Sequence, residues 1–215
     1  GNTLESPKFL DNDKLRTFNY VVANPPFSAK SWTDRVNVEN DPYERFANGN
    51  IPPGKNGDYA FMLHVLKSMR QDGKGAIILL HGVLFRGNAE SAIRQNIIKK
   101  RWIKGIIGLP ANLFYGTGIP ACIIVLDKAE AGTRQDIFII DASKDFIKDG
   151  NKNRLRECDI KKIVDCFVNQ TEIERYSRFV TVEEIKSNEY NLNIPRYIDS
   201  QEKEDIQDIE AHLRG

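Results

Sequence analysis

The run from Ala76 to Leu80 constrains the fold of this chain more than any other feature. Its residues are all apolar and do not alternate with polar ones, which is typical of a strand that is covered on both faces. Helical spacing is present on either side of the run. Apolar residues recur at i, i+3, i+4 and i+7 before it and at four-residue steps after it, as in Met62, Val65, Leu66, Met69, Ala89, Ile93 and Ile97. The pattern predicts an α/β fold with helices on both faces of a parallel sheet.

Capping and turn residues mark the ends of the expected elements. Asp58 can cap the first helix, and Asp72-Gly73 can end it. A second helix is expected from about Asn88 to the basic residues 99–101. Later strands are expected over 103–109, 121–127 and 136–141, with no room for helices between the last of them. We therefore expect the sheet to finish in antiparallel strands.

Length and composition favour one main domain with an appendage. With 215 residues, of which 40% are apolar, the chain is too short for two large cores. We place the main domain at residues 1–149 and a charged C-terminal segment at residues 150–215. This segment is expected to hold a helix over 159–169, an extended piece over 178–182, an ordered arm over 190–199 and a charged tail helix.

Charge and cysteine content limit which partners and which cellular compartment are expected for the chain. The 31 Lys and Arg residues balance 30 Asp and Glu residues, so contact with DNA has to be local or supplied by a partner. Cys122, Cys158 and Cys166 lack the spacing of metal ligands, and no secretory segment is evident. The longest apolar runs are far below the roughly 18 residues that a membrane span requires. We expect a cytoplasmic protein without a membrane-spanning part.

The motif that suggests chemistry is Asn24-Pro25-Pro26-Phe27, which follows a strand-like run over residues 18–23. Ligands in an open α/β sheet bind beyond the carboxyl ends of the strands, and this motif lies at such an end. The Asn24 side-chain oxygen and the Pro25 carbonyl can accept the two hydrogens of an amino group, and Pro26 restricts the direction of that carbonyl. Phe27 offers a flat face to an extruded base.

This combination predicts methylation of an amine whose lone pair is delocalised into a ring or a carbonyl group. Such a nitrogen is a poor nucleophile until acceptors hold both of its hydrogens and favour a pyramidal geometry. The motif alone leaves the amine open. Adenine N6, guanine N2, cytosine N4 and a glutamine side-chain amide all fit it.

Longer stretches of the sequence resemble one family. They are FNYVVANPPFS (18–28), GDYAFMLHVL (57–66), HGVLFRG (81–87), GLPANLFYGTGIPACIIV (108–125), IDAS (140–143) and YNLNIPRYID (190–199). Together they resemble the modification subunits of type I restriction–modification enzymes, in register to about residue 199. The resemblance implies a Rossmann-like, class I methyltransferase core that transfers a methyl group from S-adenosyl-L-methionine to adenine N6 in DNA. The partners that it implies are a specificity subunit, a restriction subunit and a second modification subunit.

The resemblance also assigns roles to individual positions. The motif from Asn24 to Phe27 matches the family's catalytic motif for the target amine. Phe114 or Tyr115 matches the segment that lines the pocket for the target base. Asp58 and His81 are candidates for the same pocket, although helix capping is the preferred interpretation for Asp58.

One part of the family's pattern is missing. The cofactor site of the family begins with a Gly-rich turn after the first strand, and no such turn precedes Asn24. Asn2 stands where the family often has an acidic residue, and we assign it, with Asn24, to cofactor binding. The resemblance therefore implies a partial sheet that is truncated in its N-terminal half. In this interpretation residues 1–149 are the C-terminal half of the methyltransferase domain, and the fragment is inactive alone.

The missing half has a physical consequence. The strand that ends at Asn24 would normally pair with the family's first strand, whose absence exposes an edge. We expect self-association through this edge or local disorder over residues 1–20. Two other functions stay open at this point. Residues 150–215 fit a module that docks the specificity subunit without chemistry, and Asn-Pro-Pro alone also fits a methyltransferase for protein glutamine or ribosomal RNA.

Overall fold

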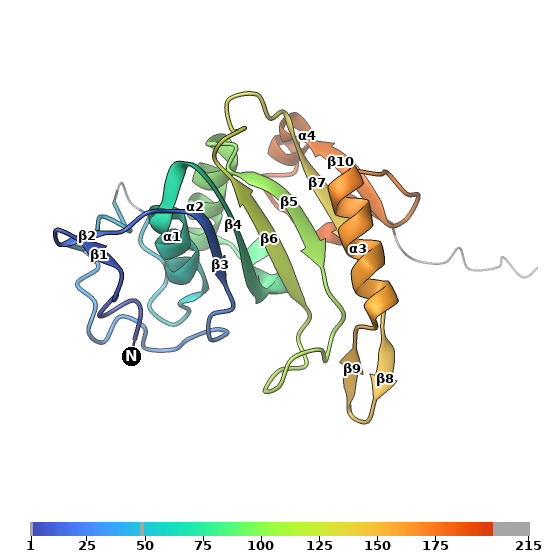
Figure 1. The fold of residues 1–215 in the computed structure, drawn as a ribbon, viewed down its shortest axis with the longest axis horizontal. Coiled ribbons are helices and arrows are strands. Elements are labelled where there is room, and N and C mark those ends of the chain that lie inside the picture. Colours follow the sequence, from blue (N-terminus) through green and yellow to red (C-terminus); the bar gives the residue numbers. More distant parts are fainter. Residues whose placement is uncertain (1, 48–49, 200–215) are drawn as a thin grey trace, which may run out of the picture.

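The computed structural model describes residues 2–47 and 50–199. These residues form a sheet with helices on both of its faces (Figure 1). The bounds of the elements are β1 Leu10–Asp11, β2 Lys14–Leu15, β3 Phe18–Ala23, α1 Asp58–Ser68, β4 Met69–Leu80, η1 His81–Leu84, α2 Asn88–Lys99, β5 Ile103–Gly108, β6 Ala121–Asp127, β7 Asp136–Asp141, β8 Ile147–Asp149, β9 Lys152–Arg154, α3 Glu157–Asn169, β10 Ser177–Thr181, α4 Val182–Ser187 and η2 Ile194–Arg196.

The main sheet confirms the expected α/β architecture. Within the described residues it has six strands in the order β10-β7-β5-β6-β4-β3. The pairs β3–β4 and β5–β7 are parallel. β6 lies antiparallel between β4 and β5, and β10 lies antiparallel beside β7. The expected antiparallel finish is therefore only partly right, because β7 returns to parallel pairing with β5.

The apolar run over residues 76–80 forms the second half of β4. Ile77 and Leu79 are completely buried on the face that α1 and α2 cover. Ile78, on the opposite face, is only partly buried. α3 covers that second face mainly over β5 and β7 (Figure 1), so the expected cover on both sides of β4 is incomplete.

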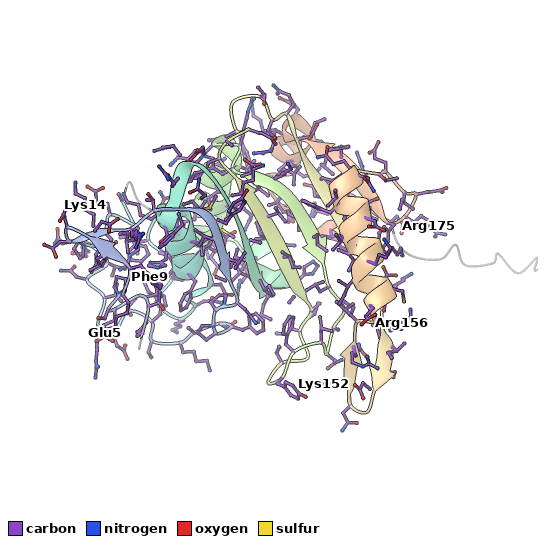
Figure 2. All side chains as sticks on the ribbon, in the orientation of Figure 1. Glu5, Phe9, Lys14, Lys152, Arg156 and Arg175 are labelled. Carbon is purple, nitrogen blue, oxygen red and sulfur yellow. The ribbon has the colours of Figure 1, made fainter. Side chains whose placement is uncertain are left out.

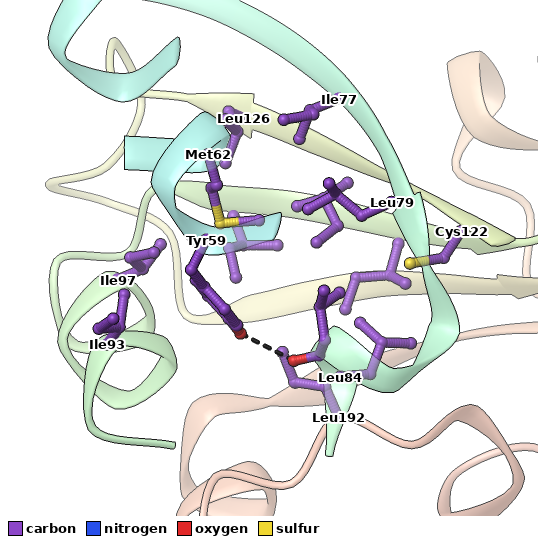
Figure 3. Close-up of a cluster of buried hydrophobic side chains, with 14 of the residues drawn as sticks. Tyr59, Met62, Ile77, Leu79, Leu84, Ile93, Ile97, Cys122, Leu126 and Leu192 are labelled. Atoms are coloured by element: carbon purple, nitrogen blue, oxygen red, sulfur yellow. Dashed lines mark hydrogen bonds between the residues drawn. The ribbon is translucent and has the colours of Figure 1, made fainter. Parts of the chain in front are cut away.

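The larger of the two cores lies between the sheet and the helices α1 and α2. It includes apolar residues from β4 and β6, and Figure 3 shows its centre. The hydroxyl of the buried Tyr59 donates a hydrogen bond to the carbonyl of Val83, at 2.7 Å, so this aromatic ring buries no unpaired polar group. Leu192 and Ile194 from the C-terminal arm are also buried in this core, which confirms that the arm is ordered.

The first helix ends earlier than its turn residues predict. α1 stops at Ser68, and β4 begins at the next residue, so Asp72-Gly73 lies inside the strand. The parallel ladder pairs Phe18 with Met69 but Tyr20 with Lys74, so residues 70–73 bulge out of register. The predicted turn is thus a bulge within β4. The second helix, α2, agrees with its predicted bounds, although Ala89 is exposed rather than part of the core.

The polar stretch over residues 28–55 is a loop, but it does not lie only on the surface. Its described residues form neither helix nor strand. Trp32 and Phe46 are each 3% exposed and pack in the larger core. The Trp32 indole donates to the Pro53 carbonyl at 2.9 Å, which ties the two ends of the loop together.

The C-terminal segment is continuous with the sheet. The boundary expected at residues 149–150 falls in the turn of the β8–β9 hairpin. The expected helix corresponds to α3, and the extended piece corresponds to β10, which forms an edge of the main sheet. The predicted tail helix lies outside the described residues. None of the described helices has the length and apolar character that a membrane crossing needs.

The N-terminal residues are ordered, so local disorder over this region is a wrong prediction for residues 2–20. They form the β1–β2 hairpin and lead into β3. The cause is a buried anchor that the sequence did not indicate. Leu4 is 1% exposed, and its carbonyl accepts a hydrogen bond from the buried Arg45 guanidinium at 2.9 Å.

The outer edge of β3 favours self-association. Among the described residues β3 pairs only with β4, and the side chains of Tyr20 and Val22 are 77% and 81% exposed. We expect the 215-residue chain to form dimers at tens of micromolar in sedimentation experiments, because unpaired strand edges accept further strands.

Lysine at position 22 should shift this equilibrium to monomer, because charged side chains at a strand edge oppose pairing. Tyr115→Lys is the matched control, since Tyr115 is 92% exposed but lies on a loop between β5 and β6. A wild-type chain that stays monomeric over the same concentration range would contradict the prediction.

Candidate active site

The predicted catalytic motif forms the turn that follows the carboxyl end of β3. β3 ends at Ala23, and all peptide bonds of the described chain are trans. Asn24 and Pro26 are exposed, whereas Pro25 between them is buried. A buried proline followed by a second proline leaves the backbone little freedom. The turn therefore presents the Asn24 side chain to solvent from a restricted backbone.

Phe27 meets the aromatic residue that was predicted for the pocket from a distant part of the chain. Its ring lies 5.2 Å from the ring of Phe114, centroid to centroid, in an edge-to-face arrangement. Phe114 belongs to the loop between β5 and β6, so the two rings come from different strand ends. The alternative residue Tyr115 is 92% exposed. The structure thus brings Phe27 and Phe114 together and leaves Tyr115 projecting into solvent.

The β8–β9 hairpin supports the loop that carries Phe114. The Lys152 ammonium donates to the Phe114 carbonyl at 2.8 Å, and the Asn153 side-chain amide donates to the Ala111 carbonyl at 2.6 Å. Figure 2 shows Lys152 where the hairpin lies beside this loop. Sequence reasoning missed both residues, because nothing in a Lys-Asn pair indicates a partner some forty positions away. The loop is consequently held from outside the main sheet.

Asp58 holds the turn that follows β3 by a hydrogen bond to its backbone. It does not cap its own helix, so the capping interpretation is wrong. Instead, its carboxylate accepts the backbone N–H of Ser28 at 2.8 Å, one residue after Phe27. The second carboxylate oxygen lies 2.6 Å from the Arg86 guanidinium, and Asp58 is completely buried. The sequence signal for Arg86 was its place in HGVLFRG, but no role was assigned to it.

His81 lies at the carboxyl end of β4, where the sequence placed it. Its backbone N–H donates to the Pro120 carbonyl at 2.9 Å, so it adjoins the end of the Phe114 loop. Burial lowers the pKa of His81, and the charge of Asp141 opposes this effect only in part. The imidazole is therefore neutral near pH 7. Its Nε2 atom is buried without a hydrogen-bond partner among the described residues.

Asn2 has a local task in the structure. Its side-chain oxygen accepts the backbone N–H of Leu4 at 3.0 Å, and its backbone carbonyl accepts the N–H of Ser6. These contacts form a turn at the start of the described chain. Among the described residues Asn2 makes no hydrogen bond with Asn24. Its assignment to cofactor binding stays a prediction.

Within the described ranges no group of three or more His, Cys, Asp or Glu side chains is placed to hold a metal ion. The turn offers the exposed amide of Asn24, its own backbone carbonyls and the ring of Phe27, which lies against Phe114. They can accept hydrogen bonds from a flat amine and stack against its ring.

Comparison with known proteins identifies the family to which this arrangement belongs. Residues 1–206 match the family described as N-6 DNA Methylase. The chain belongs to this family. Its type I relatives include the type I restriction enzyme MjaVII methylase subunit of Methanocaldococcus jannaschii. The two are 38% identical over 215 residues, which cover 96% of this chain and 36% of the relative. The MpnII methylase subunit of Mycoplasma pneumoniae is 34% identical over 196 residues, with coverages of 90% and 36%.

A solved structure shows the same fold as this member of the N-6 DNA Methylase family. It is the type I restriction–modification system methyltransferase subunit from Streptococcus thermophilus, with a TM-score of 0.81 and 38% identity over 93% of this chain and 41% of that chain. The predicted family and the class I methyltransferase fold are confirmed. The chain spans little more than a third of the length of these curated relatives.

Proposed function

We propose that the chain is part of the modification subunit of a type I restriction enzyme, which methylates adenine N6 in DNA with S-adenosyl-L-methionine as the donor. The observation that carries the proposal is the exposed Asn24 side chain beside the Phe27–Phe114 pair, at a strand end of an N-6 DNA methylase fold. The family match favours adenine N6 over guanine N2, cytosine N4 and a glutamine amide.

In this proposal the amine of an extruded adenine reaches the turn that follows β3. The Asn24 side-chain oxygen and the Pro25 carbonyl accept its two hydrogens. Phe27 stacks against the base, which contributes about 1–3 kcal/mol by comparison with other stacks of bases on aromatic side chains. Phe114 holds Phe27 edge-on and forms the pocket wall with it. The amine proton is lost after the nitrogen becomes cationic, so no side chain with a strongly raised pKa is needed.

We propose that the described residues alone do not complete a site for the donor. Asn2 is used in a local turn, and no Gly-rich turn precedes the catalytic strand. We assign most cofactor contacts to the part of the longer relatives that this chain does not cover, and we derive no step through the cofactor. Asn24, at the strand end, is the residue of this chain that we expect to lie nearest to the transferred group.

The test is methylation by the full-length protein together with its specificity partner. Duplex DNA is incubated with the donor, and the nucleosides are then separated and identified by mass. N6-methyladenine is expected as the product. N4-methylcytosine, or methylation confined to protein or RNA, would overturn the proposal.

The 215-residue chain by itself is expected to bind the donor too weakly to be measured. Calorimetric titration with S-adenosyl-L-methionine should give no heat of binding, because the Gly-rich turn that the family uses is absent. The full-length protein is the control and should bind under the same conditions. Micromolar affinity in the short chain would show that the residues around Asn24 are sufficient for a cofactor site.

The partners in this proposal are DNA, the specificity subunit, the restriction subunit and a second modification subunit. A docking role for the segment from residue 150 onward is favoured by one observation. Ile160, Val164 and Val168 recur every four residues on α3 and are 49%, 50% and 71% exposed. An apolar stripe on an otherwise charged helix suits a protein partner.

Surface substitutions test docking better than deletion, because deletion would remove β10 from the sheet. Val164→Glu with Val168→Glu should weaken assembly with the specificity subunit while the chain stays folded. Lys161→Glu, on an exposed part of the same helix, is the control. Unchanged assembly in the double variant would show that this apolar stripe does not dock the specificity subunit.

A further inference from the structure

The catalytic turn leaves β3 at the edge of the described sheet, so the ladder alone does not fix it. β3 pairs with β4 up to Ala23, and the following residues, 24–28, have no ladder partner. Ser28 has a φ of 46°, a left-handed conformation that side chains other than those of Gly, Asn and Asp rarely adopt. A residue in this conformation stays there only when contacts with the surrounding structure stabilise it.

The contact that holds it comes from a buried ion-pair network. The N–H of Ser28 donates to one Asp58 oxygen at 2.8 Å, and Arg86 lies 2.6 Å from the other oxygen. The same guanidinium lies 2.7 Å from Glu90, so it bridges two carboxylates. Asp58 is completely buried and Glu90 is 2% exposed. Burial raises the pKa of Glu90, whereas the charge of Arg86 opposes that effect.

The far end of the network is fixed to the backbone. Arg94, which is 3% exposed, donates to the carbonyls of Val83 and Arg86 at 3.1 and 2.9 Å. It also donates to the Tyr190 carbonyl at 2.8 Å, in the ordered C-terminal arm. Gly82 leaves room for the guanidinium, because a Cβ at that position would lie 3.2 Å from Arg86. The backbone of Arg86 is thus fixed by Arg94, while its partner Asp58 contacts the turn through Ser28.

We propose that Asp58 and Arg86 are positioning residues that set the geometry of the amine-holding turn. The inference rests on the proposed function, because the turn has to hold an amine for its geometry to matter. A buried ion pair is weak evidence for stability, since well-packed apolar residues often replace one without loss. Among the described residues, the hydrogen bond that links this ion pair to the turn is the one from the Ser28 N–H, so we infer that its specific effect is on where Asn24 and Phe27 lie.

The main experiment uses the full-length protein assembled with its specificity subunit. Asp58→Ala removes the acceptor for Ser28, and kcat should fall about 10- to 100-fold, as small displacements of reacting groups can cause. KM for DNA should change less than about twofold, because DNA contacts elsewhere persist. Asp58→Asn keeps an oxygen for Ser28 and should retain more activity than Asp58→Ala. Arg86→Lys, which keeps the charge but loses the planar fork, should also lower kcat.

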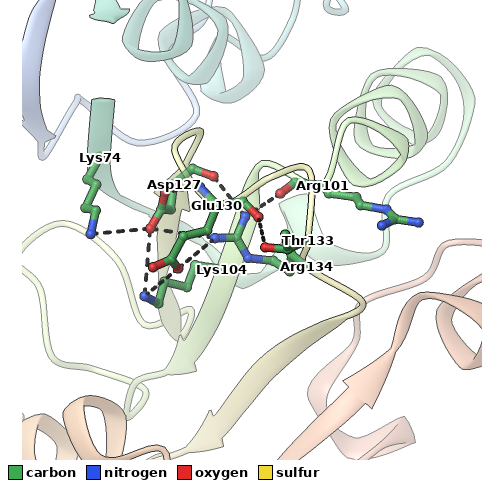
Figure 4. A network of polar contacts seen from close by, with 7 residues as sticks. All are labelled: Lys74, Arg101, Lys104, Asp127, Glu130, Thr133 and Arg134. Carbon is green, nitrogen blue, oxygen red and sulfur yellow. Dashed lines mark hydrogen bonds and ion pairs between the residues drawn. The ribbon is translucent and has the colours of Figure 1, made fainter. Parts of the chain in front are cut away.

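The matched control is Asp127→Asn. Asp127 is also completely buried and lies 3.6–3.7 Å from Arg134, Lys74 and Lys104 (Figure 4). It pairs with Lys74, far from the carboxyl ends of β3 and β4. It should lower the melting temperature and leave kcat unchanged. If Asp58→Ala lowers the melting temperature as the control does but leaves kcat within twofold, the positioning role is overturned. An equal fall in kcat in both variants would overturn it too.

A second readout does not depend on activity. Amide hydrogen exchange is followed at Ser28 in the 215-residue chain, and Asp58→Asn is used if Asp58→Ala does not fold. Exchange at Ser28 should accelerate more than tenfold in Asp58→Ala, by a smaller factor in Asp58→Asn, and not in Asp127→Asn. Unchanged exchange would overturn the proposal even if the wild type methylates adenine. Faster exchange together with a wild-type product other than N6-methyladenine would overturn the proposed function alone.

Discussion

Asn24→Ala in the full-length protein is expected to lower kcat for methyl transfer by at least about 100-fold, as removal of one preorganised polar group from an active site does. The side chain is exposed at the end of β3, so its loss removes an acceptor for the amine and leaves no cavity. DNA affinity and assembly with the specificity subunit should be unchanged. The measurement is a single-turnover methylation assay beside a DNA-binding titration.

Asn19→Ala is the matched control for this substitution. Asn19 is another exposed asparagine, located on β3 itself, and its side-chain oxygen lies 3.4 Å from the Arg70 guanidinium. The control should retain wild-type kcat. Full activity in Asn24→Ala would contradict the assignment of the catalytic motif, whereas loss of DNA binding in that variant would indicate a role in recognition instead.

Phe138→Ala is expected to lower the free energy of unfolding by about 3–5 kcal/mol, as truncation of a buried aromatic side chain does. Phe138 is 1% exposed and lies at the centre of the smaller core. Its ring centroid is 4.8 Å from that of Phe179 on β10 and 6.1 Å from that of Phe167 on α3. The cavity would therefore loosen both elements of the C-terminal segment together.

Urea unfolding of the 215-residue chain measures this effect, with circular dichroism as the probe. Phe85→Ala serves as the control, because Phe85 is 44% exposed and should lose less than about 1 kcal/mol. A loss in Phe138→Ala as small as in the control would mean that α3 and β10 are not part of one cooperative unit with the sheet.

The parts of the fold that the sequence predicted are those with a local cause. The apolar runs gave β4, β6 and β7, because side-chain periodicity is a property of neighbouring residues. The start of β4 was missed, since the bulge over residues 70–73 depends on pairing Lys74 with Tyr20, far away in the chain. The burial of Trp32 and Phe46 was missed because polar residues surround them in the sequence.

The candidate site divides in the same way. The motif from Asn24 to Phe27 is visible in the sequence because its residues are consecutive. Its supports are not consecutive: Asp58 meets Ser28 from 30 positions away, and Lys152 meets Phe114 from 38 positions away. The helix propensity of the segment after Gly57 favoured a capping role for Asp58, but the tertiary contact with Ser28 and the ion pair with Arg86 prevailed.

The position of β6 imposes an order on synthesis and folding. It follows β4 and β5 in the chain but lies between them in the sheet. During synthesis β4 and β5 are therefore made before β6. They cannot take their places in the sheet until β6 is available to pair with both. The β5–β6 connection, residues 109–120, is shorter than the stretch of chain from β4 to β6, and it is the loop that carries Phe114. Because loop closure becomes less favourable as a loop lengthens, we expect insertions in this loop to slow completion of the sheet.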